Sequence, residues 1–289
     1  MTTTPTAPTE PARASGPPRI PEGVCVPDIE APRLDPVADY LLGGSVNSQV
    51  DRDFAADLVT EFLHLPQLAV TAASWFCDAA QDMLDRGIRR FLVLGTGGLP
   101  ITAGPSTLST LHGAGARLVV VEHDLVTWYQ HYLADNAAAG RARVLCVPAD
   151  QHHDLAQRHV VADLLRGSES VGILATALLR PRGHDLATIL SLLDEAAPDS
   201  VLAITQLVTD ADTELGGLAD RFDQKGIPIS VADRTAAEKQ LRPLRRLTTD
   251  TFAYDTHPQR SPAGEIGQVV MTALLTRHAD TTPPDGRSS

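Results

Sequence analysis

The stretch RRFLVLGTGGLP, Arg89 to Pro100, decides the fold of this chain. Its apolar run Phe91–Leu94 lies between basic residues and a glycine, which is typical of a strand buried on both faces of a parallel sheet. The glycines that follow permit positive φ angles and leave main-chain N–H groups open to a ligand. A glycine-rich turn after the first strand of an α/β sheet binds nucleotide-like ligands at the carboxyl ends of the strands. The stretch therefore predicts a strand followed by a binding loop.

Strand-like and helical patterns alternate after this stretch, which predicts a mostly parallel sheet with helices on both faces. The expected strands are Leu118–Glu122, Val144–Val147, Val171–Ala175 and Val201–Gln206, and the expected linking helices are Thr107–His112, Val126–Asn136, Leu155–Leu165 and Leu186–Ala196. Near the C-terminus, Thr251–Tyr254 and Gln268–Leu275 are predicted to form an antiparallel edge. The last segment lacks polar–apolar alternation, so a helix is the alternative there.

Three helices are expected before the first strand. The first, Asp35–Leu42, would be capped by Asp35 and ended by Gly43 and Gly44. The second starts near Asp51 and carries Phe54, Leu58 and Phe62 on one face; the third runs from Pro66 to Gly87. Residues 29–88 thus form a helical segment, called the helical cover below, and residues 89–279 form the core of the same domain.

The two ends of the chain have a different composition. Residues 1–28 consist largely of Thr, Pro, Ala and Ser, and residues 280–289 are polar with two prolines. Such segments bury too little apolar surface to offset chain entropy. We expect two disordered tails around a single folded domain, residues 29–279.

Net charge and cysteine content exclude several classes of function. The formal charge of -12 argues against non-specific binding to nucleic acid or to anionic lipid. The three cysteines, Cys25, Cys77 and Cys146, have no CxxC spacing, so neither a disulfide framework nor a zinc site is indicated, and the last two are expected to be core thiols. We find no apolar run of membrane-spanning length and no signal-peptide pattern, so we expect a cytoplasmic protein.

Acidic residues end the second and third predicted strands. Glu122 closes one strand, and Asp150 follows the next after Pro148 and Ala149. A carboxylate at the first position suits ribose hydroxyls, and one at the second suits an adenine amino group. The loop itself lacks the full GxGxxG spacing, so a tight turn with glycines for geometry alone is the alternative. The three aligned strand ends favour ligand binding.

Several segments together resemble a known family. They are DPVADYLLGGSVNSQVDRDFAADL (Asp35 to Leu58), RRFLVLGTGGLP, VVVEHD (Val119 to Asp124) and the pair Ala149-Asp150. The combination resembles the actinobacterial S-adenosyl methyltransferase family, formerly carried as a domain of unknown function. The Tyr40 to Gly44 segment with Asn47, Asp51 and Arg52 is the most specific part, because a generic Rossmann-like domain has no reason to contain it.

The resemblance implies a class I, Rossmann-like methyltransferase with a seven-stranded sheet and S-adenosylmethionine bound at the glycine loop. By position, the family's binding roles fall on residues of the loop, the strand ends and the cover. The loop residues Gly95, Thr96 and Gly97 would contact methionine and ribose, Glu122 the ribose hydroxyls and Asp150 the adenine, while Tyr40, Asn47 and Arg52 would lie over the site. Gly98, a glycine inserted relative to the family pattern, extends the same candidate cofactor loop. His123 follows the ribose position, so we expect it in a loop at the cofactor edge, with a general base as the alternative.

Two departures from the family pattern keep a second function open. Val93 stands where the family usually has an acidic residue, and Arg180 stands where the family's fourth strand tends to have histidine. The first hypothesis is a methyltransferase acting on a small-molecule acceptor, with no catalytic residue assigned. The alternative is a catalytically impaired member that serves as a ligand-binding or regulatory module. An NAD-dependent oxidoreductase is less well supported, because the loop spacing differs.

A histidine cluster, His152, His153 and His159 with Asp154, is the remaining candidate site. A helix starting there would direct adjacent histidines to different faces, which disfavours a shared metal ion. We expect these side chains on the solvated surface and predict no metal. The sequence leaves the oligomeric state open.

Overall fold

The structure is a computed structural model that describes residues 28–95, 107–130, 142–175, 179, 181, 186–209, 217–242, 244–246 and 270–276. The expected strand Thr251–Tyr254 lies outside these residues, as do Arg180 and most of both expected tails. No helix in the described ranges is long and apolar enough to cross a membrane.

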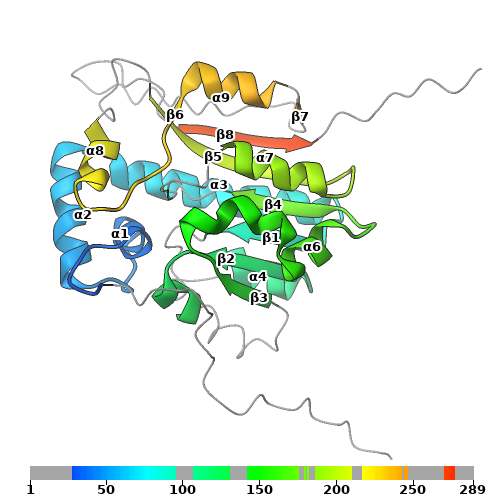
Figure 1. The fold of residues 1–289 in the computed structure, drawn as a ribbon, viewed down its shortest axis with the longest axis horizontal. Coiled ribbons are helices and arrows are strands. Elements are labelled where there is room, and N and C mark those ends of the chain that lie inside the picture. The colour runs from blue at the N-terminus through cyan, green and yellow to red at the C-terminus, as the bar shows by residue number, and fades with distance from the viewer. Residues whose placement is uncertain are drawn as a thin grey trace, which may run out of the picture.

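A mostly parallel sheet forms the centre of the molecule (Figure 1). Its strands are β1 (Arg90–Leu94), β2 (Arg117–Glu122), β3 (Ala142–Cys146), β4 (Val171–Ala175), β5 (Val201–Thr209), β6 (Ala232–Asp233), β7 (Arg245–Arg246) and β8 (Val270–Thr276). The order is β3-β2-β1-β4-β5-β8-β7, with β6 paired to β5. Strand β8 runs antiparallel to β5 and β7, which confirms an antiparallel strand near the C-terminus and excludes the helical alternative.

Helices pack on both faces of the sheet, because apolar side chains of the central strands point to both faces. Leu92 and Leu94 of β1 pack with helices α6 (His159–Leu165), α7 (Leu186–Glu195) and α9 (Arg234–Leu241). Phe91 and Val93 point to the opposite face and pack with α3 (Leu65–Asp85) and α4 (Thr107–Gly113). Because alternate residues of a strand face opposite sides, one short apolar run supplies both layers. Val93 is therefore a core residue.

The helical cover packs through its own apolar cluster. Helices α1 (Leu34–Leu41) and α2 (Gln49–Glu61) lie together at one end of the sheet (Figure 1). Their apolar side chains join Leu207 of β5 and helix α8 (Leu218–Asp223) in one cluster. The rings of Phe54 and Phe222 meet edge to face at 5.3 Å, and Arg221 forms a 3.0 Å ion pair with Glu61. The cover is thereby fixed to the segment that follows β5.

The start of two cover helices differs from the sequence expectation. Arg33 occupies the N-cap position of α1 without a side-chain capping hydrogen bond. Asp35 lies inside the first turn with only 2% of its surface exposed, so its expected capping role is wrong. Helix α2 begins at Gln49, two residues before Asp51, because Ser48 and Asp51 form a reciprocal capping box.

Two further expectations need correction. The predicted helix Leu155–Leu165 consists of a 3-10 helix, η1 (Ala149–Gln157), followed by α6, because Arg158 between them is extended. Cys146 is buried as expected, whereas Cys77 is exposed on α3. The apolar face of α3 therefore does not include the Cys77 position.

Candidate functional site

The turn after β1 begins with a glycine in the left-handed region. Gly95 has a φ of +67°, and its N–H donates a 2.8 Å hydrogen bond to the carbonyl of Val121 in β2. A side chain at this φ would be strained, which explains the glycine. Thr96, Gly97 and Gly98 lie outside the described residues, so the loop is seen only where it leaves the strand.

The carboxyl ends of three parallel strands meet beside this turn. Glu122 is the last residue of β2, is fully buried and pairs in register with Cys146 of β3. Its carbonyl accepts a 2.8 Å hydrogen bond from the N–H of Val147. Asp150 follows in the first turn of η1. The backbone arrangement thus brings the predicted ribose and adenine positions to one edge of the sheet.

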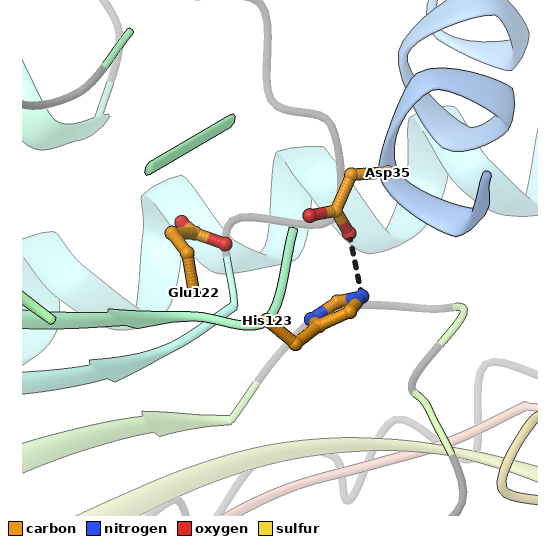
Figure 2. Close-up of side chains that lie close together, drawn as sticks. All are labelled: Asp35, Glu122 and His123. Carbon is orange, nitrogen blue, oxygen red and sulfur yellow. Dashed lines mark ion pairs between the residues drawn. The ribbon is translucent and has the colours of Figure 1, made fainter. Parts of the chain in front are cut away.

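Helix α1 adds an unexpected carboxyl group to this edge. Figure 2 shows Asp35 of α1 above the end of β2, facing His123, with Glu122 beside it. The Asp35 Oδ1 atom lies 3.2 Å from the Nε2 atom of His123. One polar atom from each of these three residues lies within 4.8 Å of the other two. Such a set can hold a divalent cation or the hydroxyl groups of a ligand.

Burial raises the pKa of Asp35 above its ordinary value of 3.8. The electrostatic interaction with His123 lowers this pKa and the nearby Asp124 carboxylate raises it, while the Thr127 hydroxyl and the Arg33 charge lower it to a smaller extent. The Thr127 hydroxyl directs its hydrogen bond to Asp124 at 3.2 Å. Burial therefore has the largest influence, and it favours the neutral form of Asp35.

Arg33 connects the start of α1 to both the sheet and α2. Its guanidinium lies 3.0 Å from the carboxylate of Asp124, which also accepts hydrogen bonds from the N–H groups of Val126 and Thr127. Its main-chain N–H donates a 2.8 Å hydrogen bond to the buried Asp51 carboxylate. The segment after Glu122 and the helical cover are therefore held together by charged contacts.

The other end of α1 contains a hydrogen-bond network. Asp39 accepts 2.7 Å hydrogen bonds from the Val46 N–H and from the Asn47 amide, while Arg52 donates to the Asn47 side-chain oxygen at 3.0 Å. A Cβ atom at Gly44 would collide with the Asp39 carboxylate. Burial raises the pKa of Asp39, and its two hydrogen bonds oppose that rise. Asn47 and Arg52 thus stabilise the turn between α1 and α2.

Tyr40, the third cover residue singled out from the sequence, is 37% exposed on α1. It is one of few large apolar or aromatic side chains of the described residues that remain accessible. Its side chain is therefore available for contact with a ligand or partner.

One member of the histidine cluster is buried, which corrects the surface position expected for His152. His152 is fully buried, and its Nε2–H donates a 2.8 Å hydrogen bond to the Val147 carbonyl. Burial lowers the pKa of His152 to about 4, so the ring is neutral at physiological pH. His153 and His159 are exposed, as expected. His152 therefore stabilises the turn that leads to Asp150.

Sequence reasoning missed three parts of this site. Asp35 was assigned to a cap, and Arg33 was not singled out, because their partners are about 90 residues away in the chain. The buried position of His152 also depends on the break in the helix at Arg158. The capping box could have been found, since Ser48 and Asp51 have its spacing.

Comparisons with known proteins agree with this geometry. Residues 26–247 match the model of a family described as S-adenosyl methyltransferase. A search of curated proteins found no match. Among solved structures, the fold is similar to a protein of Thermobifida fusca assigned as a methyltransferase, with a TM-score of 0.71, 22% identity, and coverage of 87% of this chain and 97% of that one.

A second solved structure of the same fold is a DUF574 family protein of Streptomyces avermitilis. Its TM-score is 0.68 at 20% identity, and the match covers 87% of this chain and 99% of that chain. Identities this low show the fold alone, whereas the family model spans most of the chain. The chain belongs to the S-adenosyl methyltransferase family, a Rossmann-like family whose cofactor is S-adenosylmethionine.

Proposed function

We propose that this protein binds S-adenosylmethionine across the carboxyl ends of β1, β2 and β3 and transfers its methyl group to a small-molecule acceptor. The observation that carries the proposal is Glu122, a fully buried carboxyl group at the end of β2 beside the Gly95 turn. A buried carboxylate at this place in a Rossmann-like sheet suits the two ribose hydroxyls.

Each predicted site residue has a role in this proposal. The loop from Gly95 to Gly98 contacts the methionine and ribose, and Glu122 accepts hydrogen bonds from the ribose. Asp150 accepts from the adenine amino group, and His123 borders the cofactor. Tyr40 contributes an exposed ring from the cover, while Asn47 and Arg52 act through the turn that they stabilise.

Methyl transfer requires little chemistry from side chains. The methyl group of the sulfonium is already activated, so an in-line displacement proceeds once the acceptor is held against it. A general base is needed only for an acceptor that must lose a proton. The expected contribution of this chain is therefore to orient the two reactants and to exclude water, and we assign no catalytic base.

A calorimetric titration with S-adenosylhomocysteine tests the binding part. We expect saturable binding by the wild type, weakened about tenfold in Glu122→Ala by the loss of charge-assisted hydrogen bonds. Asp53→Ala, which removes an exposed carboxylate from α2, is the matched control and should bind as the wild type does. Binding of NAD in preference to S-adenosylhomocysteine would refute the proposal.

The transfer part needs a separate assay. Incubation with methyl-labelled S-adenosylmethionine and a small-molecule extract should give a labelled product with the wild type and less with Glu122→Ala. If the cofactor binds tightly and no extract fraction is ever labelled, a role as a binding or regulatory module replaces the enzyme hypothesis.

A further inference from the structure

Asp35 is a buried carboxyl group whose oxygens make no hydrogen bond of good geometry to the described residues, because the nearby Thr127 hydroxyl is bonded to Asp124 instead. It is 2% exposed, and neither of its oxygens has a hydrogen-bond partner of normal geometry among the described residues. Its closest charged contact is the Nε2 atom of His123 at 3.2 Å. Leaving a buried polar group in this state destabilises a protein, so native structures rarely do it without a functional reason. The arrangement points to a ligand group that is bound there.

The spacing of the polar atoms beside Asp35 suits a single bridging hydroxyl group. The polar atoms of Asp35, Glu122 and His123 lie within 4.8 Å of one another (Figure 2). An oxygen atom can make hydrogen bonds of about 2.7 Å to two others if those two are less than about 5.4 Å apart. One hydroxyl can therefore bridge the carboxyl groups of Asp35 and Glu122.

The protons of such a bridge balance if one carboxyl group is neutral. A hydroxyl group can donate only one hydrogen bond, and an ionised carboxylate can only accept one. If both carboxyl groups were ionised, one carboxylate oxygen would therefore face the hydroxyl oxygen with no proton between them. If Asp35 is protonated, it donates to the hydroxyl oxygen, and the hydroxyl donates to the Glu122 carboxylate. Burial, which raises the pKa of Asp35, favours this state.

The charged and titratable groups around Asp35 come from three elements. Arg33 directly precedes the same helix, Glu122 ends β2, and His123 and Asp124 follow β2 in the chain. Cys146 of β3 also faces this group, and its thiol stays neutral because burial raises its pKa to about 12. Two carboxylates, Glu122 and Asp124, and two basic groups, Arg33 and His123, thus lie around Asp35, and burial remains the largest influence that favours its neutral form.

We propose that Asp35 is a second carboxyl group of the ribose site: a ribose hydroxyl of bound cofactor lies between Asp35 and Glu122, accepting from the first and donating to the second. This inference rests on the proposed function. A divalent cation held by the same three residues is the competing occupant. The ribose is favoured because Glu122 stands at the strand end beside the glycine turn.

The test compares two substitutions of Asp35 in the full chain. Asparagine keeps a donor at this position without a charge, whereas alanine removes the group. In titrations with S-adenosylhomocysteine we expect Asp35→Ala to bind about tenfold more weakly and Asp35→Asn to stay within about threefold of the wild type. Asp53→Ala is the control for a lost negative charge on the cover.

Deoxy ligands locate the contact. The wild type should prefer 5′-methylthioadenosine over its 2′-deoxy or its 3′-deoxy form, and Asp35→Ala should lose part of that preference for one of the two. Raising the pH should weaken binding to the wild type as Asp35 ionises and leave Asp35→Asn unchanged, with Glu122 intact in both.

Three results would overturn the inference. Wild-type affinity in Asp35→Ala would remove Asp35 from the site, and equal weakening in the alanine and asparagine variants would show that its charge acts instead of its proton. Binding of Mn²⁺ or Zn²⁺ alone, lost in Asp35→Asn, would assign the three residues to a cation. Failure of the proposed function differs from all of these, because the wild type would then not bind S-adenosylhomocysteine.

Discussion

Helix α1 contains two buried aspartates one turn apart, and their surroundings differ. Asp39, at the end toward α2, accepts hydrogen bonds from Val46 and Asn47. Asp35, at the end toward the sheet, has a contact with His123 but no hydrogen bond of good geometry to its carboxyl oxygens among the described residues. The first carboxylate has its partners within the cover, whereas the second faces the predicted ribose position.

This difference indicates that the two aspartates of α1 have different roles, Asp39 in the stability of the fold and Asp35 in ligand binding. A buried carboxylate with complete hydrogen bonds stabilises the folded state, and its removal leaves buried donors without partners. A buried carboxyl group without them destabilises the folded state until a ligand supplies a partner. Substitutions at the two kinds of position should therefore change stability in opposite directions.

We expect the largest loss of stability when Asp51 is removed, because Asp51 is a buried carboxylate with complete hydrogen bonds. Its fully buried carboxylate accepts hydrogen bonds from the Arg33 and Ser48 N–H groups and from the Ser48 hydroxyl. Asp51→Ala should lower the free energy of unfolding in urea by about 4 kcal/mol. Asp53→Ala on the exposed side of α2 should change it by less than about 0.5 kcal/mol. Similar values for the two variants would contradict the structural role of Asp51.

His152 extends the comparison to a buried group in the sheet half of the molecule. Its folded pKa of about 4 lies below the ordinary 6.5, so between these values the unfolded chain takes up a proton that the folded ring does not. Stability should therefore be lost as the pH falls from 6.5 to 4, by roughly 3 kcal/mol in total. Urea unfolding at several pH values should show this loss reduced in His152→Gln. His153→Gln, which alters an exposed ring, is the control and should lose stability at low pH as the wild type does. If His152→Gln and the wild type lose the same stability between pH 6.5 and pH 4, the role of His152 is refuted.

Substitutions at Asp39 and Gly44 should lower stability by a smaller amount, and their effects should not be additive. Asp39→Ala should destabilise the protein by about 2 kcal/mol, because two hydrogen bonds are lost. Gly44→Ala should also destabilise it, since the new Cβ collides with the Asp39 carboxylate. The double variant has no Asp39 carboxylate for the new Cβ to collide with. Its loss of stability should therefore be smaller than the sum of the losses in the two single variants. Simple additivity in thermal unfolding would argue against this close contact.

Asp35→Asn should have the smallest effect on stability, and it should raise stability at pH 7 where the other substitutions lower it. Burial raises the folded pKa of Asp35, so as the pH rises above 3.8 the unfolded chain loses this proton first. Stability is therefore full at low pH and is lost as the pH rises through the folded pKa. Without ligand, Asp35→Asn should be more stable than the wild type by about 1 kcal/mol at pH 7 and equal to it near pH 4. Thermal unfolding at both pH values checks this, and a variant that is less stable at pH 7 would contradict the comparison.

Local sequence patterns predicted most of the fold. The apolar runs at Phe91–Leu94 and Val171–Ala175 correspond to β1 and β4, because strands buried on both faces leave a continuous apolar signal. Helix ends marked by Gly43 and Gly87 were also predictable, since both residues have positive φ angles. The register of β8 against β5 was not, because pairing between distant segments leaves no local pattern.

The candidate site divides in the same way. Glu122 could be found from the sequence, because an acidic residue directly after an apolar run marks a strand end. The contact between Asp35 and His123 could not, since it depends on how α1 packs against a strand that comes much later in the chain. His152 was assigned to the surface because adjacent histidines in a regular helix diverge, and the 3-10 geometry of η1 changes which of them is buried.

The antiparallel strand β8 also has a consequence for biosynthesis. It pairs with β5 over seven residues and lies between β5 and β7, although it follows both in the chain. As the protein emerges from the ribosome, β5 therefore has an open edge until residues 270–276 are made. An open apolar edge can pair with another chain. Aggregation of nascent protein should consequently depend on how quickly β8 is inserted.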